Sequence, residues 1–127
     1  MTGFIVFAHG SRIESANEAV RDAAARLAAS AKHIVEPAFL ELGKPDLAGA
    51  AQRLEAAGVS RIVVIPYFLT LGTHLQRDLP RLVRDAASLL RAGLRMEVTA
   101  PLDGHPALIQ ALLDRAGDAL AEEGESA

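Results

Sequence analysis

The sequence predicts an α/β fold with three layers, in which helices flank a four-stranded parallel sheet of strand order 2-1-3-4. Four β-rich runs alternate with four helical patterns over residues 1–127, and this alternation is typical of a parallel sheet. The third run is apolar at every position from Ile62 to Ile65, as expected of a central strand that is covered on both faces. Right-handed connections around central first and third strands then give the order 2-1-3-4. We expect a single domain over residues 1–127, with a frayed tail at about residues 122–127.

The first strand and the first helix are predicted from the N-terminal segment. An apolar run ends in the stretch FIVFAHGSR, and small apolar residues then recur at helical spacing as far as Ala31, which indicates a helix packed on a sheet. Two capping boxes compete for the start of this helix, Ser11 with Glu14 and Ser15 with Glu18. The position of its first turn therefore stays open.

The second strand and its helix are expected in the next segment. The run HIVEPAF, residues 33–39, is typical of a strand. Pro45 and Asp46 then open a helix, and Gly58 is its expected end.

The third helix is predicted to begin with Asp78 as its N-cap and with Pro80 in its first turn. The segment from Tyr67 to Arg77 is accordingly predicted to be a long loop. The last strand, residues 94–99, alternates apolar and polar side chains and should lie near a sheet edge. A final helix is expected to follow Pro106.

The composition excludes several classes of function. The chain has no cysteine, so it has no disulfide, thiolate metal ligand or cysteine nucleophile. A net charge of -3 and an aromatic content of 4% argue against a nucleic-acid partner. No apolar run approaches the roughly 20 residues of a membrane-spanning helix, so no membrane association is expected. The N-terminal residues lack the features of a secretory signal, and a cytoplasmic location is expected.

Two histidines are predicted to meet at one edge of the sheet. His9 follows the first strand and His74 lies in the loop after the third strand, and ligands of such sheets bind beyond the carboxyl ends of the strands at the switch point between them. Neutral imidazole is a common ligand of divalent first-row metals, and it also accepts protons near neutral pH. Each residue has a simpler alternative: His9 could bond a loop carbonyl, and His74 could be an exposed loop residue.

Other residues of the same loops are weaker candidates for a ligand site. Gly10 and Gly72 permit a tight turn or a close backbone approach, although both could simply be ordinary loop glycines without a function. Ser11 has a capping role available and is a weak nucleophile candidate, and the chain lacks both the G-x-S-x-G elbow and the phosphate loop G-x-x-x-x-G-K-[ST]. Four cations in or beside these loops could attract an anion, with solvated surface charge as the alternative: Arg12, Lys44, Arg77 and Arg81.

Three further titratable residues have ordinary alternatives. Glu41 follows the second strand and could reach the rim beside His9, although a solvated carboxylate is an equally simple interpretation. His105 precedes Pro106 at a helix start, which explains its place, and His33 begins a strand at the opposite end of the sheet. We assign no function to His33.

The ordered motifs resemble a known family. FIVFAHGSR at the start, PAFLEL in the middle, RIVVIPYFLTLGTHLQRDLP after it and PLDGHPAL near the end are together similar to the small sirohydrochlorin chelatases of the CbiX type. The pattern G-x-H-x-x-x-D-[IL]-P after a strand is the most specific of these motifs. The resemblance covers nearly the whole chain.

The resemblance implies a chelatase-like fold and a class II chelatase. Such an enzyme inserts a divalent metal into the tetrapyrrole sirohydrochlorin without ATP, in cobalamin or sirohaem biosynthesis, and uses no organic cofactor. The family's metal-handling histidines map onto His9 and His74, and Glu41 at the PAFLE position would assist metal or proton transfer. Co2+ and Fe2+ are the expected metals; Ni2+ is disfavoured because the chain lacks a histidine-rich insertion.

The resemblance also implies a homodimer with a cleft shared between subunits. At this cleft we expect the substrate-binding residues to be Gly10, Ser11, Arg12, Gly72 and Arg77. Two other functions remain open: a non-catalytic metal or tetrapyrrole carrier that uses the same crevice, and an anion-binding enzyme that uses the Gly10 turn at a helix N-terminus. The physiological metal, the dimer interface and the place of His105 also remain open.

Overall fold

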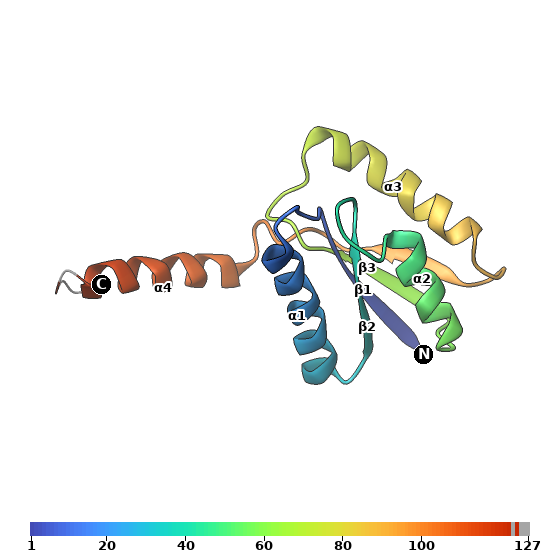
Figure 1. Cartoon of the computed structure of the whole chain (residues 1–127), viewed down its shortest axis with the longest axis horizontal. Coiled ribbons are helices and arrows are strands. Elements are labelled where there is room, and N and C mark those ends of the chain that lie inside the picture. Colours follow the sequence, from blue (N-terminus) through green and yellow to red (C-terminus); the bar gives the residue numbers. More distant parts are fainter. Residues whose placement is uncertain (123, 125–127) are drawn as a thin grey trace.

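The computed structural model describes residues 1–122 and 124, and Figure 1 shows the arrangement of their helices and strands. Strands and helices alternate along the chain, as the sequence predicts. The elements are β1 (Thr2–Ala8), α1 (Glu14–Ala31), β2 (Ile34–Phe39), α2 (Leu47–Ala56), β3 (Arg61–Pro66), α3 (Thr73–Ser88), β4 (Arg95–Val98) and α4 (Pro106–Glu122). None of the helices in this described part is long and apolar enough to cross a lipid bilayer.

The four strands form one parallel sheet of order β2-β1-β3-β4, which confirms the predicted topology. The central strand β1 pairs with β2 on one side and with β3 on the other, so that Phe4 lies between Val35 of β2 and Val63 of β3. All four strands therefore end at the same edge of the sheet, and the loops that follow β1, β2 and β3 gather there.

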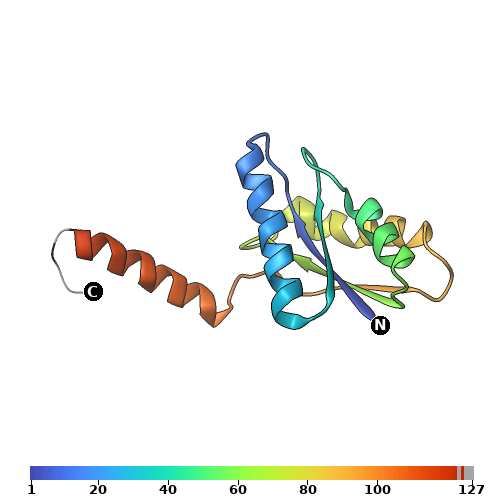
Figure 2. The ribbon, with the colours of Figure 1, turned by 60° about the horizontal axis from the view of Figure 1, so that its bottom comes forward.

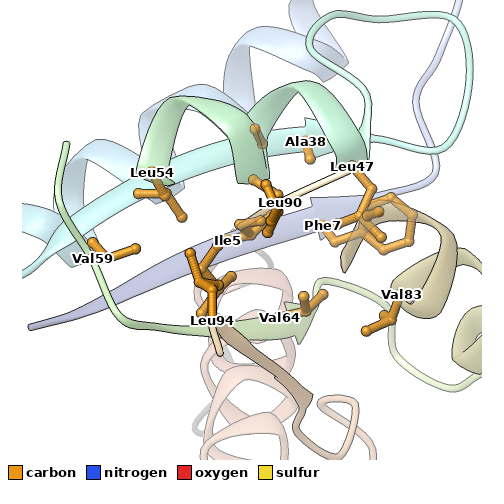
Figure 3. Close-up of a cluster of buried hydrophobic side chains, with 14 of the residues drawn as sticks. Ile5, Phe7, Ala38, Leu47, Leu54, Val59, Val64, Val83, Leu90 and Leu94 are labelled. Atoms are coloured by element: carbon orange, nitrogen blue, oxygen red, sulfur yellow. The ribbon is translucent and has the colours of Figure 1, made fainter. Parts of the chain in front are cut away.

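The two faces of the sheet are covered by different helices. On one face α2 and α3 enclose the larger core, in which Ile5, Phe7, Leu54 and Val64 are fully buried (Figure 3). On the other face α1 covers β1 and β2 (Figure 2). Burial of each large apolar side chain stabilises the fold by about 1.5–3 kcal/mol, so these cores hold the strand ends in fixed positions.

The last helix is not packed on the sheet. Helix α4 follows Pro106 as expected, but it projects away from the sheet (Figures 1 and 2) and has no buried residue. Its apolar side chains are therefore left uncovered by this chain. The tail predicted to fray at residues 122–127 lies largely outside the described residues.

Neither capping box forms at the start of α1. The helix begins at Glu14, and its N-cap, Ile13, makes no side-chain cap. Both carboxylates that the boxes require, those of Glu14 and Glu18, instead accept hydrogen bonds from Arg21 at 2.6 and 3.1 Å. The Ser11 hydroxyl accepts a bond from the Ile13 main-chain N–H at 3.0 Å. The predicted caps fail because these side chains have other partners.

The start of α3 is also corrected. The helix begins at Thr73 with Gly72 at its N-cap, so Asp78 is not a cap and Pro80 lies inside the helix. A proline within a helix removes one main-chain hydrogen bond, and the buried stripe of this helix, which includes Leu79 and Val83, holds it on the sheet despite that loss. The predicted loop is therefore shorter, and His74 lies in the first turn of α3.

The start of α2 is as predicted. The Asp46 carboxylate accepts a hydrogen bond from the Gly49 N–H at 2.8 Å, and Gly58 follows the helix with a φ of +93°.

Candidate functional site

The loops that follow β1 and β2 lie side by side because the strand pairing continues beyond the strands. The Leu40 N–H donates to the Ala8 carbonyl at 2.9 Å, and the Glu41 N–H donates to the His9 carbonyl at 3.0 Å. Gly10 makes this approach possible: its φ is +95°, and a Cβ at this position would lie 1.7 Å from the Glu41 carbonyl oxygen. Only glycine fits this backbone, so the predicted close approach at Gly10 is a contact with the neighbouring loop.

His9 and Glu41 are brought together at this edge. The His9 Nε2 atom lies 3.0 Å from Glu41 Oε1, and the two side chains are 57% and 58% exposed. A neutral imidazole that donates its Nε2 proton to a carboxylate keeps a lone pair on Nδ1. A carboxylate in this position orients a metal-binding imidazole and increases its basicity. The Phe68 ring packs edge-on against His9, with 6.4 Å between ring centroids.

His74 lies across a small cavity from the first strand. The cavity has a volume of about 240 Å³, and its walls come from the β1 and β2 exits and from α3. They are formed by His9, Leu40, His74, Leu75, Asp78, Arg81 and Leu82. The two histidines predicted to converge at this edge therefore line one cavity.

Helix α3 contributes a polar face to this cavity, in which the place of Asp78 was missed by sequence reasoning whereas Arg81 was expected beside the loops. Asp78 and Arg81 lie one and two turns after His74, and residues at this spacing share a helix face. Asp78 had been predicted to be a helix cap. The spacing would have indicated its true place if the helix had been predicted to start at Thr73.

The cavity suits an ion that is held loosely. Across residues 1–122 and 124, no three side chains from His, Asp or Glu are grouped to hold a metal. An ion held by His9 and His74 would thus keep positions open for water or for a substrate donor atom, whereas structural zinc sites have four protein ligands.

The other predicted site residues lie near the cavity without forming its walls. Gly72 begins α3 with a φ of -68°, and no atom lies within 4 Å of a Cβ added there. Arg12 and Arg77 are exposed on the adjoining segments. Ser11 is half-buried, and its hydroxyl is engaged with the Ile13 N–H. The cavity walls therefore include none of Gly10, Ser11, Arg12, Gly72 or Arg77.

The two remaining histidines lie elsewhere. His105 begins α4, where its Nδ1 accepts a hydrogen bond from the Ala107 N–H at 3.0 Å, and it lines a separate cavity beside α4. The His33 ring packs against the Phe4 ring at a tilt of 51°, with 5.0 Å between centroids. His105 therefore stays outside the cavity of His9 in this chain.

The chain is similar to chelatases of plants and archaea. It is 35% identical over 114 residues to "Sirohydrochlorin ferrochelatase, chloroplastic" of Arabidopsis thaliana. The aligned segment covers 89% of this chain and 50% of that protein. It is 29% identical over 128 residues to a sirohydrochlorin cobaltochelatase of Sulfolobus acidocaldarius. This alignment covers 99% of this chain and 98% of that protein. The chain thus spans half the length of the plant relative and nearly the whole archaeal one.

The fold has a solved relative as well. The crystal structure of a cobalamin (vitamin B12) biosynthesis CbiX protein from Marinobacter aquaeolei VT8 superposes with a TM-score of 0.83 at 26% identity, over 96% of this chain and 99% of that one. The CbiX family model matches residues 3–119. This chain therefore belongs to the CbiX family.

Proposed function

We propose that this chain is a sirohydrochlorin chelatase, which inserts Co2+ or Fe2+ into the tetrapyrrole without ATP. The observation that carries the proposal is the convergence of His9 and His74 on one cavity, with Glu41 bonded to His9. The names of the relatives, sirohydrochlorin ferrochelatase and cobaltochelatase, support the same reaction.

The reaction needs a weak metal site beside a base. The incoming divalent ion forms bonds to the four ring nitrogens and displaces two pyrrole N–H protons, so the charge of the ion is balanced by the two protons released. His9 and His74 hold the ion and leave its other positions free for ring nitrogens. As the ion moves to the ring nitrogens, the freed lone pair of the His9 imidazole, oriented by Glu41, accepts one pyrrole proton, and the other proton goes to water at the exposed carboxylate.

Cations around the rim would orient the substrate, which carries several carboxylates. Arg81 lines the cavity, and Arg12 and Arg77 are exposed nearby. Guanidinium groups bind carboxylates through paired hydrogen bonds. Cobalt and iron both suit imidazole ligands, so the choice between them is left to a metal-by-metal assay.

An insertion assay tests the proposal. Purified protein mixed with excess sirohydrochlorin and Co2+ or Fe2+ should show many turnovers, and His9→Ala or His74→Ala should abolish them while circular dichroism stays unchanged. His33→Ala is the matched control, because this histidine packs against Phe4 near the other end of β1. A single equivalent of bound ligand without turnover would favour the carrier alternative. Normal turnover in both single variants would refute the assignment of the histidines.

We also propose that the protein acts as a homodimer. The cavity of His9 and His74 measures about 240 Å³, below the roughly 300–1,000 Å³ of typical ligand pockets, so a macrocycle needs further walls. Helix α4 carries an uncovered apolar stripe in which Leu112 is 66% exposed, together with Ile109 and Leu113. A second copy of this chain would cover that stripe.

The linker before α4 favours a second copy over the chain's own sheet. The Leu102 N–H donates to the Phe68 carbonyl at 3.0 Å, and the His105 N–H donates to the Leu102 carbonyl at 3.1 Å. His105 then accepts the bond from Ala107 in the first turn of α4. These bonds order the linker in the conformation that directs α4 away from the sheet, which leaves its apolar stripe available to another subunit.

Analytical ultracentrifugation tests this part of the proposal. The wild-type chain should sediment as a dimer, and replacing Ile109 and Leu112 with Glu should give monomers with reduced turnover. Ala121→Glu is the control, since it adds a negative charge at an exposed position of the same helix without replacing Ile109, Leu112 or Leu113. A monomeric wild type, or a dimer that survives the double substitution, would contradict the role of α4.

A further inference from the structure

Asn17 is a buried polar side chain in the first turns of α1. It is 2% exposed, and it is the one polar or charged side chain in the buried set of the described residues. Its amide makes three hydrogen bonds, all to main-chain groups. Oδ1 accepts from the Ser11 N–H at 2.9 Å, and Nδ2 donates to the Ser11 carbonyl at 2.9 Å and to the Leu42 carbonyl at 2.8 Å.

These bonds join the two loops that carry the His9–Glu41 pair. Ser11 follows His9 by two residues, and Leu42 follows Glu41 directly. Leu42 has a φ of +57°, a left-handed conformation that a leucine adopts only where its surroundings enforce it. The bond from Asn17 to the Leu42 carbonyl supplies such a constraint. The same side chain therefore fixes both backbones that flank the pair.

We propose that Asn17 is a positioning residue for metal insertion. By holding the two loops in register, its amide keeps Glu41 within hydrogen-bond distance of His9. The side chains of the pair are more than half exposed, so few packing contacts hold them in place. If the two loops separated, these contacts would not restore the distance between His9 and Glu41. The effect on turnover rests on the function proposed above; the effect on the His9–Glu41 bond does not.

The chemistry of the three bonds explains why an amide is needed. One acceptor and two donors are required on a single short side chain, and asparagine supplies both. Aspartate has nearly the same shape, but its carboxylate would face two carbonyl oxygens with no proton to donate. Leucine has a similar volume and would leave the three main-chain groups without their partner, a costly outcome for buried groups.

Substitutions of Asn17 should lower kcat more than they alter KM. We expect Asn17→Leu and Asn17→Asp to reduce kcat about 10- to 100-fold, the loss typical of a misplacement near 1 Å, with KM for sirohydrochlorin changed less than about threefold. Val20→Ala is the matched control, because Val20 is buried on the same helix in the core beneath α1. It should lower Tm and leave kcat near the wild-type value.

A double-mutant cycle separates positioning from general damage. If Asn17 acts through the His9–Glu41 pair, Asn17→Asp should cost much less in a Glu41→Gln background than in the wild type. Equal losses in both backgrounds would show independent effects and would overturn the proposal.

The ring nitrogens of His9 give a readout without substrate. In 15N NMR spectra, the shift of Nε2 should report its bond to Glu41 in the wild type and should move in Glu41→Gln. The same movement in Asn17→Asp or Asn17→Leu would support the proposal, and Val20→Ala should leave the signal in place. An unchanged His9 signal in both folded Asn17 variants would overturn it. A wild-type chain that fails to metallate sirohydrochlorin would refute the proposed function and leave this NMR test intact.

Discussion

Replacing Gly10 with alanine tests whether the contact between the β1 and β2 loops determines the site. The residue has a φ of +95°, and the new Cβ would lie 1.7 Å from the Glu41 carbonyl oxygen. Because real Cβ contacts stay beyond 3.0 Å, the loops would have to separate by about 1.3 Å there. The left-handed backbone costs about 1–2 kcal/mol, and the forced shift costs about 1–3 kcal/mol.

We therefore expect Gly10→Ala to lower the free energy of unfolding by about 2–5 kcal/mol. Urea denaturation followed by circular dichroism measures this loss. A displacement above 1 Å next to the reacting groups should also reduce kcat for metal insertion about 100-fold. The activity is measured well below the lowered Tm, so that only folded protein contributes.

Gly58→Ala is the matched control for the backbone strain alone. Gly58 has a φ of +93°, and no atom lies within 4 Å of its added Cβ. This variant should lose about 1–2 kcal/mol and keep its turnover. If Gly10→Ala is no less stable than Gly58→Ala and retains wild-type kcat, the reasoning about the two loops is wrong.

Three further changes test other parts of the structure. Gly72→Ala should lower the free energy of unfolding by at most about 1 kcal/mol, because the position has an ordinary φ and open space around it but alanine is a poorer N-cap than glycine. It should raise KM if the tetrapyrrole lies against it; an unaltered KM would remove Gly72 from the substrate site. Asp46→Ala should lower the free energy of unfolding by about 0.5–2 kcal/mol through loss of the α2 cap, and a loss below that range would show that the cap contributes little. Arg61 donates two hydrogen bonds to Glu97 at 2.9 and 2.8 Å and holds the pKa of that carboxyl below its ordinary value. The pair stabilises the folded chain above the unfolded-state pKa of Glu97 and loses this effect as the pH falls through the lowered pKa. Glu97→Gln should accordingly be less stable than the wild type near neutral pH, and the difference should vanish in acid; a difference that persists in acid would contradict this assignment.

The adjacency of His9 and Glu41 could be predicted because it follows from topology. Both residues lie within two positions of the ends of parallel strands, and parallel neighbours end at the same edge of a sheet. Their hydrogen bond, by contrast, depends on Gly10 and Asn17, which act through main-chain contacts between loops. No periodicity in the sequence indicates such contacts, so the role of Asn17 between the two loops was not predicted.

The start of α3 could not be predicted correctly because two local cues were misleading. Asp78 and Pro80 have the types and spacing of a helix N-terminus, but the helix begins at Thr73 and runs through the proline. Tertiary packing of its apolar stripe outweighs the local preference. This error hid the face on which Asp78 and Arg81 accompany His74.

The existence of α4 could be predicted, and its place could not. An amphipathic pattern indicates a helix with one apolar face, but it does not say which surface will cover that face. The helix is held away from its own sheet by the ordered linker at Leu102 and His105.

The central claim is that two imidazoles, one directly after β1 and one in the first turn of α3, hold the metal before insertion. Anomalous X-ray diffraction from crystals soaked in Co2+ tests it most directly, because the signal locates the ion independently of activity. We predict one strong peak in the cavity, within coordination distance of a ring nitrogen of His9 and of His74. A cobalt ion bound by other residues, with both rings free, would contradict the account.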